Sequence, residues 1–334
     1  MEIIRDLDEC LWREFVDRHP HSQVFHTPEM FQVFAHTKGY RPSLWAAVGL
    51  DNRPKALLLP VEITLMRGPL RSVTSRAVVY GSVLCAPGAE GREALRELLR
   101  TYRRAPDTGF LFTELRNLSD LSELQPVLEE NGFVFEEHLN FILDLRRSQE
   151  EIWSNVHAAA RRNIRKSRNL RVAIEEVTDP QRIPAIYTLL KAIYQRLHVP
   201  LVDASLFQSA FEILRPQGMM QILVARVENV DIGALTLLLH KDIVYYWYTG
   251  TLREFSACRA GDLLVWHALE WGREHGCRIL DFGGAGKPDE EYGVRDFKAK
   301  FGGTLVNYGR NVCVHAPLAY QLSMKVYQIA RRFL

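Results

Sequence analysis

The chain has 334 residues, enough for two domains of average size. Hydrophobic residues make up 47% of it and charged residues 25%, which is ordinary for a soluble globular protein. The formal net charge is only +2, which excludes a protein that coats nucleic acid through a general basic field, so we expect no DNA partner. The five cysteines are widely spaced and include no CxxC pair, which indicates reduced thiols in a cytoplasmic chain.

Two further observations bound the function. The N-terminus is acidic and amphipathic, unlike a signal peptide, and the best apolar run, 56–66, is too short to span a bilayer. His19, His21 and His26 lie close together in a Pro-containing loop without a nearby carboxylate. We interpret them as surface residues, and we expect a protein that holds no metal ion.

The elements predicted in the first half begin with a hairpin. Hydrophobic runs at 44–50 and 55–63 flank Asp51-Asn52, a typical turn. The elements predicted after it are a strand ending at Tyr80-Gly81, a helix over 91–104, a strand over 110–115, a short helix ending at Asn131-Gly132 and a strand over 141–145.

The second half repeats this order. Its predicted elements are hairpin strands over 220–228 and 232–239, a strand over 243–250, a helix over 262–275, a strand over 279–282, a short helix around Phe297-Lys298 and a strand over 305–314. The repeated order predicts two domains, 1–147 and 148–334. Strands mixed with flanking helices place both in the α/β class, with mixed sheets of the α+β type.

The most informative stretch is 278–309, where Gly283-Gly284 and Gly302-Gly303 bracket a charged loop and a short helix. Glycine pairs let the backbone approach a ligand closely or take a positive φ, although most mark simple turns. Lys298 lies beside two apolar anchors at i,i+4 spacing, Phe297 and Phe301. Asp281, at the end of a strand, is a candidate for handling a proton, and capping a neighbouring loop is the alternative.

A basic cluster at 161–171 carries six basic residues and no acidic one. The preceding segment predicts one helix over 150–167, whose apolar stripe consists of Trp153, Val156, Ala160 and Ile164. The candidate phosphate-binding residues are Arg161, Arg162 and Arg165, because bidentate arginine suits a diphosphate. A solvated helix end that matches the helix dipole is the alternative.

Two weaker candidate regions are the predicted strand 243–250 and the segment just before the helix that follows it. Arg259 and Gly261 precede a helix whose first N–H groups can bind an anion, and a simple helix cap at Asp262 is the alternative. Alternation in the run 245–248 puts Tyr246 and Tyr248 on one face, and the other two aromatic residues on the opposite face. We expect one face in the core and the other, with Tyr248 as the candidate, along a substrate cleft.

The segment 278–309 resembles the C-terminal domain of the FemA/FemB/FemX aminoacyltransferases and of the related BioF2-like acyltransferases, and the likeness extends from about residue 26 through Tyr308. It implies two tandem GNAT-like acyltransferase domains. It also implies that Phe297 and Lys298 lie in the active site, with Lys298 as a positive charge at the reacting carbonyl or the donor's ribose-phosphate. The basic helix would meet phosphates of a nucleotide-linked or lipid-linked acceptor. The long arm of FemA and FemB is not expected, since Pro200 interrupts the helical stretch 180–214.

The implied chemistry is aminolysis of an activated acyl group, which needs positioning and oxyanion stabilisation but no covalent nucleophile and no tightly bound cofactor. The leading hypothesis is a FemX-like aminoacyltransferase that moves an amino acid from aminoacyl-tRNA to a peptidoglycan-type cell-wall precursor. The second is an acyl-CoA-dependent N-acyltransferase of amino-sugar or polysaccharide biosynthesis, against which the single Gly261 weighs, because a longer glycine-rich run is usual there. The third is a non-catalytic module that binds a phosphorylated or RNA ligand through 161–171.

The C-terminal segment 315–334 predicts an amphipathic basic helix. We expect it to dock on the domain. Peripheral contact with the inner face of a membrane is the alternative, and it would suit a lipid-linked acceptor.

Overall fold

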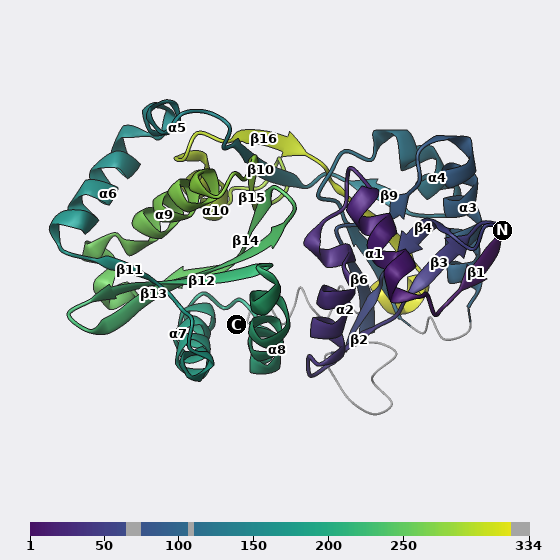
Figure 1. The fold of residues 1–334 in the computed structure, drawn as a ribbon, viewed down its shortest axis with the longest axis horizontal. Coiled ribbons are helices and arrows are strands. Elements are labelled where there is room, and N and C mark those ends of the chain that lie inside the picture. The colour runs from purple at the N-terminus through teal and green to yellow at the C-terminus, as the bar shows by residue number, and fades with distance from the viewer. Residues whose placement is uncertain (65–74, 106–109, 322–334) are drawn as a thin grey trace. The chain divides into compact units, whose positions relative to one another are not determined.

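The computed structural model describes residues 1–64, 75–105 and 110–321 (Figure 1). The chain forms two compact units, of which unit 1 comprises 1–137 and 308–334, and unit 2 comprises 138–307. Of the predicted C-terminal helix, residues 322–334 lie outside the described part of the chain.

Unit 1 contains two sheets. The first has the strand order β1 (Glu2–Ile4), β3 (Trp45–Val48), β4 (Pro54–Leu58) and β7 (Leu84–Cys85). The second has the order β2 (Tyr40–Pro42), β5 (Val61–Thr64), β6 (Ser75–Tyr80), β8 (Phe112–Arg116), β17 (Arg310–Val314) and β9 (Val134–Glu136). The helices are α1 (Glu9–Arg18), α2 (Pro28–Ala35), α3 (Gly88–Arg104) and α4 (Gln125–Glu130), with short 3-10 turns at Val24–His26 and Ser122–Leu124.

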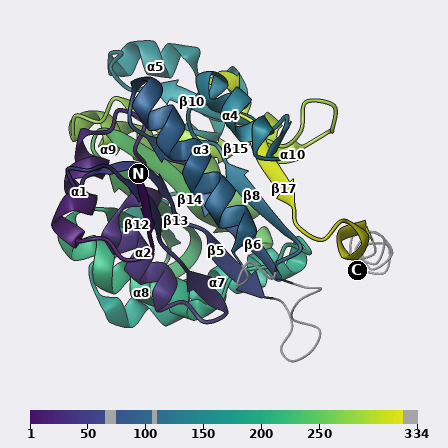
Figure 2. The same cartoon turned by 90° about the vertical axis from the view of Figure 1, so that its right-hand side faces the viewer.

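The long helix α3 contributes the central apolar stripe of one core cluster of unit 1, and it lies across the strands as Figure 2 shows. Leu95, Leu98 and Leu99 recur at helical spacing and are fully buried against Val79 and Leu115. Each such side chain contributes about 1.5–3 kcal/mol when it leaves water.

Unit 2 is built on one seven-stranded sheet. Its strand order is β11 (Ala173–Glu176), β12 (Met220–Val227), β13 (Val230–His240), β14 (Ile243–Thr251), β15 (Ile279–Gly284), β10 (Leu139–Asp144) and β16 (Thr304–Asn307). The helices are α5 (Gln149–Asn155), α6 (Ala158–Asn169), α7 (Ile183–Arg196), α8 (Ala204–Leu214), α9 (Ala260–Glu274) and α10 (Gly293–Ala299), with 3-10 turns at Pro180–Arg182, Arg215–Gln217 and Arg253–Cys258. Helices α6 and α9 lie on one face of the sheet, and α7 and α8 lie on the other (Figure 1).

The last strand of each predicted half joins a different sheet from the one expected. The strand predicted over 141–145 is β10, which pairs between β15 and β16 in unit 2. The strand predicted over 305–314 is interrupted at Gly309, which has a φ of +67°, so β16 stays in unit 2 while β17 pairs between β8 and β9 of unit 1. A Cβ at Gly309 would lie 2.1 Å from the Phe135 ring, so only glycine fits at this bend.

The strand predicted over 55–63 is divided, because β4 ends at Leu58 and β5 begins at Val61 in the other sheet of unit 1. The remaining predicted elements occur with small shifts. Both predicted hairpins form, as β3–β4 and β12–β13. Helix α3 begins three residues before the predicted start at residue 91, and α9 begins two before the predicted start at 262. Helices α7 and α8 are separate and short, as expected from the break at Pro200.

The helix predicted over 150–167 is two helices, α5 and α6. Val156 is extended, with a ψ of 131°, and the His157 side chain accepts a hydrogen bond from the Ala159 N–H, which starts α6 anew. The His157 N–H donates to the Lys300 carbonyl at 2.7 Å, so the break is fixed by a contact distant in sequence. The predicted apolar stripe is nevertheless buried at Val156, Ala160 and Ile164.

Two of the three N-terminal histidines are buried, which corrects their interpretation as surface residues. His26 is 1% exposed and its Nδ1 accepts the Gln23 N–H, while His19 is 8% exposed and bonds the Cys85 carbonyl. Backbone partners replace the water that a surface histidine would contact. Within the described ranges no group of His, Cys, Asp and Glu is arranged to hold a metal, and no helix there is long and apolar enough to cross a membrane.

Candidate functional site

Two parallel strands in the middle of unit 2 pair over only part of their length. Strands β14 and β15 pair over Ile243–Tyr245 and Ile279–Asp281. Beyond these residues β14 continues beside β13 as far as Thr251, and β15 continues beside β10 (Figure 1). Ligands of α/β proteins commonly bind at the carboxyl ends of parallel strands, where neighbouring strands diverge. The place where this pairing ends is therefore the candidate site.

Lys298 lies at this place and is almost completely buried, with 6% of it exposed. Helix α10 carries it, and the neighbouring rings of Phe297 and Phe301 meet edge to face at 5.5 Å. Lys298 Nζ donates to the carbonyl oxygens of Phe282 at 2.6 Å and of Gly284 at 2.7 Å. An ammonium group has three donors, so these two bonds fix its position and leave a third donor.

Asp281 is the second charged group buried here, with 2% of it exposed. Its Oδ1 accepts the Gly283 N–H at 2.7 Å, which is the local capping bond expected as an alternative role. Burial raises the pKa of Asp281 to about 7, although the Gly283 N–H and the Lys298 charge both oppose the rise. Burial likewise lowers the pKa of Lys298 to about 8, against the charge of Asp281. A buried acid and base that both titrate near neutral pH are typical of a catalytic site.

The first glycine pair lets other side chains approach the end of β15. Gly283 has a φ of +68°, and a Cβ there would lie 3.1 Å from the Tyr245 hydroxyl of β14. A Cβ on Gly284 would lie 2.8 Å from His138 Nε2. Larger residues would displace these side chains, so both glycines serve close approach here.

The N-terminus of α9 lies beside Phe297. A Cβ on Gly261 would be 3.8 Å from Phe297 Cζ and 3.6 Å from Thr251 Cγ2. Arg259, with a left-handed φ of 56°, is the N-cap residue immediately before α9, so Asp262 belongs to the first turn and does not cap the helix. The structure therefore brings together Gly261, Phe297, Lys298, Asp281 and the glycine pair, and Arg259 is exposed where α9 starts.

Tyr248 has different surroundings, because a β-bulge interrupts the predicted alternation. Thr236 of β13 pairs with Tyr248 while Leu237 pairs with Tyr246, so Trp247 is the extra residue. Trp247 and Tyr248 both pack against Phe207 of α8, at ring distances of 6.3 Å and 4.9 Å. The predicted opposite faces for these two residues are thus wrong, since the bulge re-aims one of them.

The arginines of α6 are used partly within unit 2. Arg161 reaches the carbonyl oxygens of Trp153 and Ser154 at 3.4 Å and 3.3 Å, and Arg165 lies 5.6 Å above the Trp153 ring. These contacts attach α6 to α5, a structural role that neither the phosphate-binding hypothesis nor the solvated helix end described. Arg162 is exposed on the same helix.

Arg295 is a residue that the sequence analysis missed. Its Nε donates to the Ala285 carbonyl at 2.8 Å, and its two other nitrogens donate to the carbonyls of Pro288, at 3.2 Å, and Lys287. The guanidinium thus holds the loop after β15 in place. Its spacing of three residues before Lys298, one helical turn, is the sequence signal that could have identified it.

Comparison with known proteins places this geometry in a class. Residues 154–298 match the acetyltransferase (GNAT) domain family. No curated protein sequence matches the chain significantly. Among solved structures, FemX superimposes with a TM-score of 0.73 at 15% identity, covering 96% of this chain and 99% of that one.

Two further structures show the same architecture. L-PGS from Bacillus licheniformis superimposes with a TM-score of 0.60 at 13% identity, over 97% of this chain and 98% of that one. A tandem GNAT protein from the clavulanic acid biosynthesis pathway gives 0.59 at 13% identity, over 94% and 98%. The chain therefore has the tandem GNAT fold. The fold-level likeness to FemX-like proteins that the sequence predicted is confirmed.

Proposed function

We propose that this protein is an N-acyltransferase that transfers an acyl group from acyl-CoA to an amine at the end of β15. The observation that carries the proposal is the buried pair Asp281 and Lys298 at the point where β14 and β15 stop pairing. An extended thioester donor can lie along β14 beyond Tyr245, where its pairing with β15 ends, as added strands do on sheet edges. The GNAT match over 154–298 supports the same reading.

The transfer requires no covalent enzyme intermediate. The amine nitrogen attacks the thioester carbonyl, a C–N bond forms, and the carbonyl electrons move to oxygen. The intermediate then collapses, the C–S bond breaks, and the thiolate leaves. In this proposal Asp281 takes the proton that the amine loses, for which a pKa of about 7 is well placed. Lys298 keeps a positive charge beside the developing oxyanion.

The remaining predicted residues take supporting roles in the proposal. Gly261 lies in the first turn of α9 and Phe297 lies beside it. The N-terminus of this helix suits the diphosphate of coenzyme A, and Arg259 adds a charge there. Gly283 and Gly284 keep the end of β15 open to the acyl group. Tyr248, among the aromatic residues of α7 and α8, lies on the continuation of β14 and is proposed to contact the acceptor.

The test is thiol release from acetyl-CoA and longer acyl-CoAs with amino sugars and short peptides as acceptors, with product identified by mass spectrometry. We expect Lys298→Ala and Asp281→Asn each to lower turnover by at least about 100-fold. Lys300→Ala, two residues further on at the end of α10 and half-buried, is the matched control and should retain activity. Turnover of Lys298→Ala within a few-fold of wild type would remove the proposed role of Lys298.

Aminoacyl transfer from aminoacyl-tRNA to a cell-wall precursor is the second candidate. The exposed Arg162 and Lys166 on α6 favour it, because they could contact the phosphates of tRNA or of a lipid-linked acceptor. A labelled amino acid on tRNA, offered with a nucleotide-linked amino-sugar peptide, distinguishes the two donors. Ligand binding that weakens steeply with salt and yields no product with either donor would instead support a non-catalytic module.

A further inference from the structure

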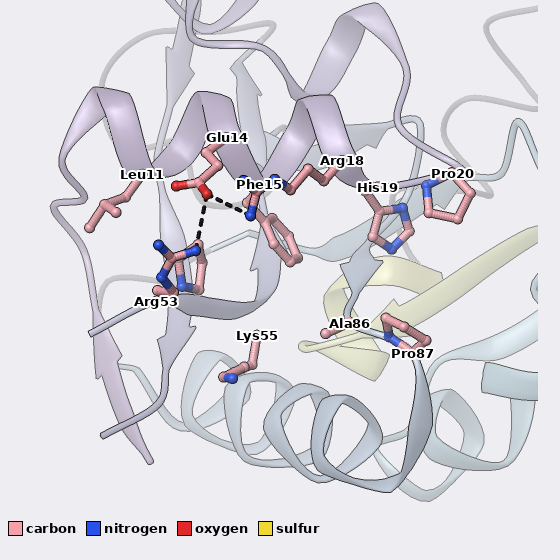
Figure 3. A pocket seen from close by; sticks show the side chains of 11 residues that line it. Leu11, Glu14, Phe15, Arg18, His19, Pro20, Arg53, Lys55, Ala86 and Pro87 are labelled. Atoms are coloured by element: carbon pink, nitrogen blue, oxygen red, sulfur yellow. Dashed lines mark hydrogen bonds and ion pairs between the residues drawn. The ribbon is translucent and has the colours of Figure 1, made fainter. Parts of the chain in front are cut away.

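A cavity in unit 1 has no part in the proposed reaction. It has a volume of about 280 Å³ and lies between α1, the start of β4 and the turn that leads into α3 (Figure 3). This volume is close to the lower end of small-molecule sites, about 300–1,000 Å³. All the residues that line it belong to unit 1.

The floor and one wall of the cavity are apolar. Phe15 and Leu11 of α1 are only half-buried, while Trp12 and Val16 of the same helix pack into the core. Prolines complete the apolar lining, namely Pro20, Pro54 and Pro87. The two half-buried side chains of α1 therefore offer apolar surface to an occupant.

The rim of the cavity is positively charged. Arg18, Arg53 and Lys55 line it together with one carboxylate, Glu14. Glu14 accepts from both guanidinium groups, at 2.7 Å from Arg18 and 3.0 Å from Arg53 (Figure 3). Lys55 Nζ lies 3.4 Å from carboxylate oxygens of both Asp51 and Glu90, which are outside the cavity lining. The lining itself thus holds three cations and one anion, while Asp51 and Glu90 lie beside Lys55 outside it. Glu14 shows that a carboxylate fits between the arginines.

His19 forms an uncharged wall. Its Nδ1 accepts the His21 N–H at 3.2 Å, so its Nε2 carries the proton and donates to the Cys85 carbonyl at 2.8 Å. Both ring nitrogens are used within the chain, which leaves the cations on the rim to select the ligand.

We propose that this cavity binds a small amphipathic carboxylate, with its apolar chain against Leu11 and Phe15 and its carboxylate at Arg53 and Lys55. A bound carboxylate would be a second anion for the two arginines and would replace the long contacts of Lys55. The binding site is independent of the acyl-transfer site of unit 2.

The test is isothermal titration of the full chain with hexanoate and octanoate, and with octanamide and octylamine as neutral and cationic analogues. We expect octanoate to bind at least ten-fold tighter than octanamide and the amine to bind most weakly. Each added methylene should improve binding about four-fold, which corresponds to about 0.8 kcal/mol. Equal binding of octanoate and octanamide, or no saturable binding of octanoate at millimolar concentration, would overturn the proposal.

The double variant Arg53→Gln, Lys55→Gln is the second arm. Both side chains lie on the rim, so we expect unchanged thermal melting without ligand and at least a ten-fold loss of octanoate affinity. Arg92→Gln is the matched control, because Arg92 lines a neighbouring cavity of about 330 Å³ and not this one. If the double variant binds octanoate as tightly as wild type, the cationic rim does not select the ligand and the proposal fails. Neither result bears on acyl transfer in unit 2, so this proposal and the proposed function can fail independently.

Discussion

Replacing Lys298 with methionine tests how the buried pair is held together. Methionine fills similar space, but it leaves the carbonyls of Phe282 and Gly284 without their donor and Asp281 without its counter-charge. The Lys298 charge acts on buried Asp281 electrostatically, and removing the group that compensates a buried charge costs about 3–5 kcal/mol. For a unit of this size 1 kcal/mol shifts the melting temperature by about 2–4 °C, so a loss of about 10 °C is expected.

The pH dependence of this loss is the sharper part of the prediction. The folded-state pKa of Asp281 is raised, so stability falls as pH rises from the unfolded value toward about 7. Without the Lys298 charge this pKa rises further, and the fall continues above pH 7. Burial lowers the pKa of Lys298 in the wild-type protein, so its contribution to the free energy of unfolding instead increases as pH rises above about 8. The deficit of the variant should therefore be larger at pH 8.5 than at pH 5.5.

Thermal unfolding followed by circular dichroism at these two pH values measures the effect. Lys300→Met is the matched control, because Lys300 is half-exposed and should cost no more than about 1 kcal/mol. A Lys298→Met protein that melts within about 2 °C of wild type at both pH values would refute the view that Lys298 holds the end of β15.

Three further predictions concern single residues. The wild-type pH profile of kcat/KM should rise through about pH 7 as Asp281 ionises and fall above about pH 8 as Lys298 loses its proton. Asp281→Asn should lose the rising limb. If the rising limb persists in this variant, another group must cause it. In urea unfolding, Gly302→Ala should cost about 1–3 kcal/mol more stability than Gly276→Ala. Both glycines have a positive φ, but only at Gly302 would a Cβ lie 2.7 Å from a backbone oxygen. Equal losses of stability would argue against that contact. Arg168→Ala should change stability by less than about 1 kcal/mol, since its 3.4 Å pair with Glu270 is exposed, and a larger loss would mean that α6 depends on it.

The strand and helix order was predictable from sequence because it follows local periodicity, whereas strand partners were not. The run that forms β10 has the pattern of a half-buried strand whichever sheet it joins. Its place between β15 and β16 depends on residues about 140 and 165 positions away along the chain. The break between α5 and α6 has a similar origin, since the His157 N–H is satisfied by Lys300, far along the chain.

Some of the site residues were predictable from the sequence because they form a local pattern. The glycine pairs, Phe297 and Lys298 are close in sequence, so their spacing signals a common location. The burial of Asp281 and Lys298 and the resulting pKa values depend on packing from several elements and have no local pattern. The bulge at Trp247 likewise follows from pairing with β13, and it moved Tyr248 away from the predicted arrangement.

The burial of Lys298 also bears on why its site needs a helix rather than a loop. A buried ammonium is costly unless hydrogen bonds and an opposite charge compensate it. Here the two carbonyls at the end of β15 and the Asp281 carboxylate supply this compensation, and α10 delivers the side chain to them. Arg295, one turn earlier on α10, holds the loop that leaves β15 by three carbonyl contacts. The same short helix therefore fixes both the charge and the strand end, so substitutions at Arg295 should alter the Lys298 environment without touching substrate.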